Sequence, residues 1–225
     1  MKPRAPQYDR ETATNWIYPS NYPVREYQRK IVSQALFINT LVCLPTGLGK
    51  TLIAAVVMYN FYRWFPTGKV IFMAPSKPLV SQQVSACHNI MGISEGDTAH
   101  LEGSVHSDKR QQLWENKRLF FCTPQTLQND IKSGICDAHA IVCIVIDEAH
   151  KATDNYAYTA VVSAISQFSN NFRVLALSAT PGTDQRKIQN VIHNLNIAHI
   201  GMCYSVYTHY THYNTRYTRY TRYTL

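Results

Sequence analysis

The 225-residue chain has no long apolar segment that could anchor it in a membrane. Its longest apolar run covers residues 52–59, far short of the ~20 residues that a helix needs to cross a bilayer. Residues 1–6 carry charge and proline with no apolar stretch behind them, so we expect no secretory signal. These absences favour a soluble, intracellular protein without a membrane partner.

The sequence also lacks a paired cysteine motif. Its six cysteines are scattered, and none forms a Cys-x-x-Cys pair, which argues against a zinc site or a disulfide framework. Cys43, Cys122 and Cys143 lie in or beside apolar runs. We therefore predict buried, reduced thiols that act as small apolar side chains.

Acidic residues are missing from the end of the chain, where the last one is Asp184. The formal net charge is +8, but residues 1–184 hold 17 basic and all 14 acidic side chains. The body of the chain is thus only mildly basic. This charge permits nucleic-acid binding without requiring it.

Short, continuous apolar runs alternate with segments of helical periodicity. Runs of this kind are typical of strands in a parallel sheet that helices cover on both faces. We therefore predict an α/β fold, a RecA-like P-loop NTPase domain with a mostly parallel sheet. The helix that follows the glycine loop is apolar all round, so its aromatic residues Phe61, Tyr62 and Trp64 are predicted to be core rather than base-stacking platforms. The predicted strands are 40–44, 70–74, 119–122, 141–146 and 174–177, and the predicted helices are 24–37, 49–64 and 77–90.

A glycine loop joins the first predicted strand to the second predicted helix. A triphosphate needs many short donors at once, and backbone N–H groups at a helix N-terminus supply them. Lys50 would reach the β and γ phosphates, and the Thr51 hydroxyl would ligate Mg²⁺. Leu44 departs from the general pattern, which has glycine at that position. The predicted ATP-binding loop is Pro45-Thr46-Gly47-Leu48-Gly49-Lys50-Thr51.

The strand 141–146 ends in an Asp-Glu-Ala-His (DEAH) box. We expect Asp147 to hold Mg²⁺, partly through water, and Glu148 to act as the general base that activates the attacking water. Lys50, Asp147 and Glu148 are thus the predicted catalytic residues. His150 is expected to hydrogen-bond toward Ser178 or Thr180 and so couple the nucleotide to the next strand; an ordinary structural histidine is the alternative.

Together these motifs make the chain resemble helicase superfamily 2. The segments 16–19, 23–28, 41–51 and 55–66 resemble more closely the family of the Fanconi anaemia complementation group M protein, which includes the archaeal helicase-associated nuclease. The resemblance covers roughly residues 15–197. It implies a nuclear, ATP-dependent DNA helicase or translocase that remodels forks and four-way junctions in interstrand cross-link repair, together with repair-complex proteins.

The resemblance also assigns roles to individual residues. Gln28 would read adenine, aided by Tyr27 and Arg25. Glu102 stands where the family has threonine, and an acid there would repel phosphate. The residues expected to contact the backbone of branched or double-stranded DNA are Pro75, Ser76, Lys77, Thr123 and Gln125.

Three segments are predicted: a flexible lead-in over 1–15, an ATP-binding domain over 16–200, and a Tyr/Thr/Arg/His repeat over 201–225. The repeat has a three-residue period that fits neither helix nor strand, and we interpret it as non-native sequence; a basic, aromatic arm that stacks on bases is the alternative. No second motor domain is predicted, so we expect poor activity from this chain alone. A non-hydrolysing binding module and a duplex RNA sensor remain alternative hypotheses.

Overall fold

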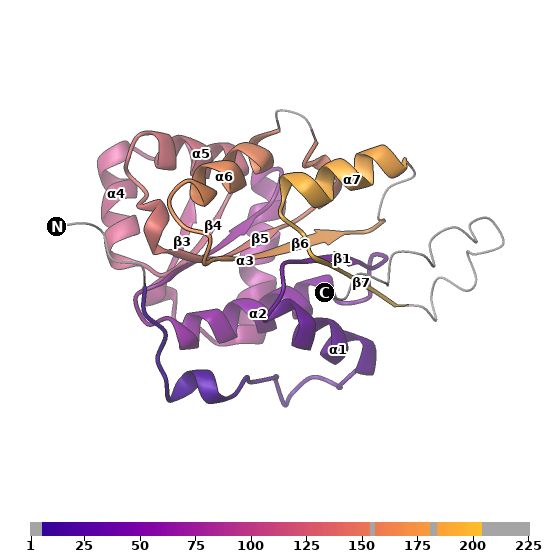
Figure 1. Ribbon diagram of the computed structural model, residues 1–225. Coiled ribbons are helices and arrows are strands. Elements are labelled where there is room, and N and C mark those ends of the chain that lie inside the picture. The colour runs from indigo at the N-terminus through magenta and orange to yellow at the C-terminus, as the bar shows by residue number, and fades with distance from the viewer. Residues whose placement is uncertain (1–5, 154–155, 181–183, 204–225) are drawn as a thin grey trace.

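A seven-stranded sheet forms the centre of the computed structural model, which describes residues 6–153, 156–180 and 184–203 (Figure 1). The strand order is β3-β4-β2-β5-β6-β1-β7, and every neighbouring pair is parallel. The predicted α/β fold with a parallel sheet is therefore confirmed. The strands are β1 (Thr40–Cys43), β2 (Lys69–Met73), β3 (Thr98–Leu101), β4 (Leu119–Cys122), β5 (Ile141–Ile146), β6 (Arg173–Ser178) and β7 (His199–Met202).

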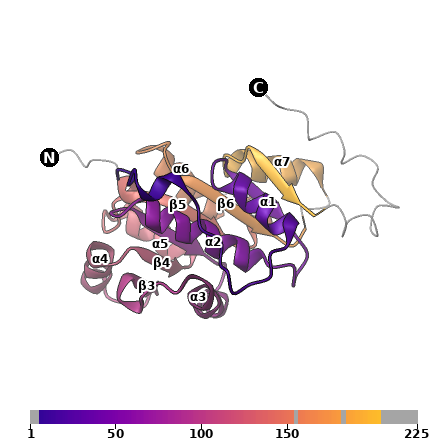
Figure 2. The same cartoon turned by 90° about the horizontal axis from the view of Figure 1, so that it is seen from below.

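Helices cover both faces of this sheet. Strand residues alternate between two separate cores; Phe72 and Val145 face one, and Ile71 and Ile144 face the other. Both alternating sets are buried, which is why the strands are continuous apolar runs rather than alternating ones. On the first face, which is nearer the viewer in Figure 2, lie α1 (Glu26–Ala35), α2 (Lys50–Trp64) and α3 (Lys77–Met91); on the second lie α4 (Ser107–Asn116), α5 (Pro124–Lys132), α6 (Ala157–Ser166) and α7 (Gln185–Asn194).

The strand β7 lies at the sheet edge beside β1 and was not predicted. It extends past residue 200, where the predicted domain ends, and Cys203 behind it is buried. A Cβ on Gly201 would lie 3.1 Å from the Ile31 side chain, so this strand packs closely on α1. The domain therefore continues to at least residue 203. Most of the predicted repeat, 204–225, lies outside the described residues.

The N-terminal residues pack along α2. The Asp9 N–H donates to the Trp64 carbonyl at 2.7 Å, and the Trp64 indole donates to the Asn15 carbonyl at 2.9 Å. The side chain of Asn60, fully buried, exchanges two hydrogen bonds with the backbone of Ile17. These contacts satisfy polar groups at the end of a buried helix. Residues 9–15 of the predicted flexible lead-in are thus attached to the domain.

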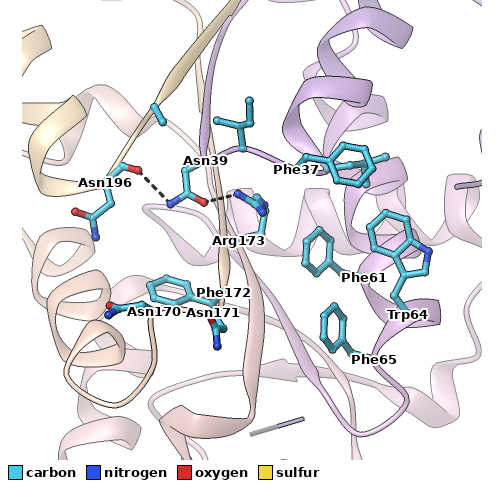
Figure 3. A pocket seen from close by; sticks show the side chains of 13 residues that line it. Phe37, Asn39, Phe61, Trp64, Phe65, Asn170, Asn171, Phe172, Arg173 and Asn196 are labelled. Atoms are coloured by element: carbon cyan, nitrogen blue, oxygen red, sulfur yellow. Dashed lines mark hydrogen bonds between the residues drawn. The ribbon is translucent and has the colours of Figure 1, made fainter. Parts of the chain in front are cut away.

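Just before β1, the side chain of Asn39 links the start of β6 to the segment that leads into β7 (Figure 3). Asn39 donates to the Asn196 carbonyl and accepts from Arg173 Nη1 and from the Val174 N–H, at 3.0–3.1 Å. Beside it lies a cavity of about 540 Å³, lined by aromatic and amide side chains; Arg173 is the charged residue among them. This edge of the sheet is held by hydrogen bonds and aromatic packing, and the buried Arg173 Nε has no hydrogen-bond partner among the described residues.

Two predictions about side-chain burial are confirmed. All six cysteines are buried, and burial raises the pKa of Cys43, Cys87 and Cys143 to about 12. Phe61 and Trp64 are core residues, 6% and 7% exposed, whereas Tyr62 is partly buried against the same core and donates its hydroxyl to Asp97. Among the residues that the structure describes, no helix is both long and apolar enough to span a bilayer.

Candidate functional site

The predicted phosphate loop leaves the carboxyl end of β1 and leads directly into α2. Gly47 and Gly49 adopt φ angles of +85° and +81°, the left-handed region that favours glycine. Gly49 is the residue that immediately precedes α2. The first N–H groups of that 15-residue helix have no intrahelical acceptor and point out of its N-terminus. The loop therefore directs backbone N–H donors and the positive end of the helix dipole toward the same place, just beyond the N-terminus of α2.

Residues of α1 and the segment before it support the loop from the side. The Leu48 carbonyl accepts hydrogen bonds from Tyr27 Oη and Gln28 Nε2, both at 3.0 Å, and Arg25 donates to Tyr27 Oη at 3.2 Å. A Cβ on Gly49 would lie 2.1 Å from Gln28 Nε2, so this close approach also requires glycine. The structure thus brings all three residues predicted for adenine recognition to the loop.

Lys50 and Thr51 are the first two residues of α2. The Lys50 side chain bonds to the loop backbone, and the Thr51 hydroxyl bonds to a side chain of α3. Lys50 Nζ donates to the Leu44 carbonyl at 2.7 Å, which places the ammonium across the loop. Burial lowers the pKa of Lys50, while the charges of Asp147 and Glu148 act in the opposite direction. The ammonium is therefore close enough to the DEAH box to sense both carboxylates.

The carboxylates of the DEAH box have different environments. Asp147 is 8% exposed, and its burial raises its pKa, although it accepts a hydrogen bond from the Glu148 N–H at 2.9 Å. Glu148 has φ = 50° and ψ = 47°, which is unusual for a residue with a side chain. Such backbone strain concentrates at functional sites. This turn directs two adjacent carboxyl groups differently from one strand end.

His150 connects the DEAH box to β6. Its Nδ1 lies 3.2 Å from Glu148 Oε2 and 3.5 Å from Ser178 Oγ. Ser178 in turn accepts a hydrogen bond at its carbonyl from the Leu44 N–H and donates its hydroxyl to the Thr180 carbonyl. The predicted coupling residues therefore form one chain of contacts, from the carboxylate to the start of the phosphate loop.

Two predicted DNA contacts lie at the same edge, where α3 follows β2. Ser76 immediately precedes α3, and Lys77 is exposed at its first position. Lys77 Nζ lies 3.3 Å from Glu102 Oε2, and Ser104 also donates to that carboxylate. Glu102 thus forms an ion pair with Lys77, the lysine that was predicted to bind DNA phosphate. Pro75 is half-buried between β2 and α3.

Thr123 and Gln125 occupy the matching position on the neighbouring strand. β4 pairs with β2, and α5 begins directly after β4, with Thr123 just before it and Gln125 exposed in its first turn. Two helices thus begin side by side at the carboxyl edge. The exposed Lys77 and Gln125 thus lie in the first turns of two neighbouring helices at this edge.

Two further contacts at the site were not predicted. Thr51 Oγ1 lies 3.2 Å from Gln83 Oε1 of α3, and the Tyr158 hydroxyl of α6 donates to the Asp147 carbonyl at 2.7 Å. The sequence singles out Gln83 as a polar residue on the apolar stripe Val80, Val84, Cys87 and Met91, but it does not indicate Thr51 as its partner. No sequence pattern links Tyr158 to Asp147.

The geometry agrees with a comparison against known families. Residues 21–183 match the family described as "Type III restriction enzyme, res subunit". This match spans well over half of the chain and includes the loop, the DEAH box, Ser178 at the end of β6 and Thr180 just after it. The chain belongs to this family.

Curated relatives carry helicase names. The chain is 55% identical over 188 residues to the "Fanconi anemia group M protein" of Gallus gallus, covering 84% of this chain and 9% of that protein. It is 55% identical over 194 residues to the "ATP-dependent DNA helicase fml1" of Schizosaccharomyces pombe, covering 86% of this chain and 23% of that protein. These similarities confirm the family resemblance. The chain spans less than a quarter of the length of either relative.

A solved structure shares the fold. The helicase domain of Hef from Pyrococcus furiosus superimposes with a TM-score of 0.75 at 35% identity, covering 80% of this chain and 38% of that one. A DEAD box protein from Methanococcus jannaschii, at 19% identity and a TM-score of 0.59, shows the same fold. The domain is therefore RecA-like, as predicted.

The residues present fit ATP and Mg²⁺. Gln28 is 3% exposed and its Oε1 has no hydrogen-bond partner among the described residues, so it can accept from a ligand N–H such as the adenine amino group. Gly47 has no atom within 4 Å of the Cβ position, which leaves the loop open for close phosphate approach. Thr51 and Asp147 provide oxygen ligands, the type that Mg²⁺ prefers.

Proposed function

We propose that this chain is the ATP-binding half of an ATP-dependent DNA helicase or translocase that remodels branched DNA. The observation that carries this proposal is the convergence of the phosphate loop, the DEAH box and Ser178 at one edge of the sheet, joined by contacts of 2.7–3.5 Å. ATP would be its substrate and Mg²⁺ its metal ion.

The binding step would use the loop and its lysine. Lys50 would leave the Leu44 carbonyl for the β and γ phosphates, a stronger, charge-assisted contact. Backbone N–H groups of the loop and of the first turn of α2 would complete the phosphate cradle. Gln28, Tyr27 and Arg25 would hold the base, since they already surround Leu48. Mg²⁺, held by Thr51 and Asp147, would neutralise charge on the transferred phosphoryl group.

The hydrolytic step would use Glu148 as base. Its carboxylate would take a proton from the attacking water, and His150 at 3.2 Å would orient it. The contact between His150 and Ser178 would transmit the change from ATP to its hydrolysis products to β6 and, through Leu44, back to the loop. Ser178 thereby gives the nucleotide a mechanical link to the rest of the sheet.

DNA would bind where α3 and α5 begin. Ser76, Lys77, Thr123 and Gln125, together with Pro75, would contact backbone phosphates, which carry no sequence information. Recognition of the backbone suits a protein that selects forks and four-way junctions by their structure. We further propose a nuclear location and partners among repair-complex proteins, in line with the names of the relatives.

The test measures binding of fluorescent ATP and of four nucleic acids: a fork, a four-way junction, a linear DNA duplex of equal length and a duplex RNA. We expect Mg²⁺-dependent ATP binding and tighter binding of the two branched DNAs. Lys50→Ala should lose ATP binding while keeping DNA binding. Tighter binding of duplex RNA than of DNA would contradict the DNA proposal. The proposed location has a separate test: exclusion of a fluorescent fusion of this chain from the nucleus would contradict it.

A further inference from the structure

Gln83 reaches from α3 to the threonine that is proposed to ligate Mg²⁺. Its Oε1 lies 3.2 Å from Thr51 Oγ1, in a partly buried contact between two packed helices. An amide oxygen only accepts hydrogen bonds, so the Thr51 hydroxyl must be the donor. The contact therefore fixes the direction of the hydroxyl proton.

That direction matters for a metal ligand. A hydroxyl that ligates a cation offers a lone pair to the metal and must send its proton elsewhere. With the proton directed at Gln83, the lone pairs of Thr51 Oγ1 are left for another partner. Groups that orient metal ligands in this way commonly contribute about 10–100-fold to metal affinity or activity.

The face of α3 that carries Gln83 continues as a buried surface one turn further along the helix. Cys87 lies one turn beyond Gln83 and is fully buried. Burial raises the pKa of its thiol to about 12, and the charge of Asp147 acts in the same direction. The stripe of α3 that carries Gln83 is therefore packed against α2, the helix on which Thr51 lies.

We propose that Gln83 is a positioning residue for Mg²⁺, which holds the Thr51 hydroxyl in the orientation that ligates the ion. This inference rests on the proposed ATP site. It adds a residue outside the loop and the DEAH box, on the helix whose first turn carries the candidate DNA contact Lys77.

The test titrates Mg²⁺ into the 225-residue chain with the fluorescent nucleotide mant-ADP and measures binding, not turnover. Gln83→Met keeps the length of the side chain but removes the amide acceptor. We expect the Mg²⁺ concentration at half-maximal response to rise about tenfold, with metal-free mant-ADP affinity unchanged. Gln83→Glu accepts the same hydrogen bond and should keep the wild-type response or strengthen it.

The neighbouring residue provides the matched control. Gln82 is exposed, so Gln82→Met makes the same chemical change on the outer face of α3 and should leave the titration unchanged. An unaltered Mg²⁺ response in a folded Gln83→Met, or an equal loss in Gln82→Met, would overturn the role of Gln83. Should Gln83→Met fail to fold, a weakened response in Gln83→Glu would overturn it instead.

The outcomes also separate this inference from the proposed function. Wild-type binding of mant-ADP that Lys50→Ala abolishes supports the phosphate site by itself, whatever Gln83→Met does. Wild-type binding that Mg²⁺ does not enhance would remove the metal role and with it the role of Gln83. No mant-ADP binding by the wild type would overturn the proposed function itself.

Discussion

The two edges of the central sheet are built in opposite ways. At the carboxyl edge, Asp147 is buried as a carboxylate, Glu148 has a positive φ, and two glycines hold left-handed backbone. At the amino edge, the Asn39 side chain bonds to Arg173 and Val174 of β6 and to the Asn196 carbonyl, beside a cavity with aromatic and amide side chains in its lining (Figure 3). The same strands therefore end in positive-φ backbone and adjacent carboxylates on one side, and in side-chain hydrogen bonds and aromatic packing on the other.

This contrast separates function from stability. Strain and buried charge cost folding free energy and persist where the surrounding structure enforces them, commonly at functional sites. The amino edge has a cavity of about 540 Å³, but Arg173 is the one titratable residue among those that line it. Convergent chemical groups, rather than cavity volume, identify the functional edge here.

The largest effect is expected from Lys50→Ala at the carboxyl edge. ATP affinity should fall by about 100-fold, since a hydrogen bond to a charged group contributes about 1.5–3 kcal/mol and Lys50 would make more than one. The Tm should stay nearly constant because burial already disfavours the ammonium. Isothermal calorimetry and thermal melting measure both quantities. Unchanged ATP affinity would contradict the phosphate-loop assignment.

The reverse pattern is expected from Asn39→Ala at the amino edge. Removing the side chain leaves the Val174 N–H without its acceptor and breaks the link to Asn196, which should cost about 1–3 kcal/mol of unfolding free energy. ATP affinity of the folded protein should not change. Urea denaturation measures the loss, and Asn170→Ala, an exposed residue on the same cavity, is the control. A loss of ATP binding in folded Asn39→Ala would break the contrast between the edges.

Asp147→Asn is expected to have a smaller effect than Asn39→Ala, and to raise the unfolding free energy where Asn39→Ala lowers it. Burial raises the pKa of Asp147 above its ordinary value, so the ionised carboxylate destabilises the fold once the pH exceeds the folded-state pKa. The asparagine variant should therefore melt higher at pH 7, by a few degrees if the gain is about 1 kcal/mol. The gain should shrink as the pH falls through the folded-state pKa of Asp147. A lower Tm at pH 7 would show that the carboxylate stabilises the domain.

The smallest effect is expected from Glu102→Gln, which releases Lys77 from an exposed ion pair. Affinity for duplex DNA should rise by about two- to fivefold at low salt, and the gain should diminish as salt screens the added phosphate contact. Fluorescence anisotropy at two salt concentrations measures it. Lys77→Ala combined with Glu102→Gln should cancel the gain; if the gain persists, Glu102 acts on DNA without Lys77.

Much of the fold was predictable because the strands are buried on both faces. The runs at 119–122 and 141–146 coincide with β4 and β5, and the other predicted strands differ by one residue at one or both ends. β3 and β7 were missed because both lie at the sheet edges, where burial is incomplete and the apolar signal is weak. The helix predicted over 24–37 shortened to Glu26–Ala35, since Val24 and Phe37 are exposed.

The sequence by itself determined which residues can bind a triphosphate and a metal, because the glycine loop and the DEAH box follow buried strands directly and depend on local backbone geometry. Only the tertiary structure decided the contacts between segments distant in sequence: Gln83 with Thr51, Glu102 with Lys77, and Tyr158 with Asp147. Such contacts depend on how helices from different parts of the chain pack at one edge of the sheet. Local pattern carries no information about that packing, so these partners appear only once the chain is folded.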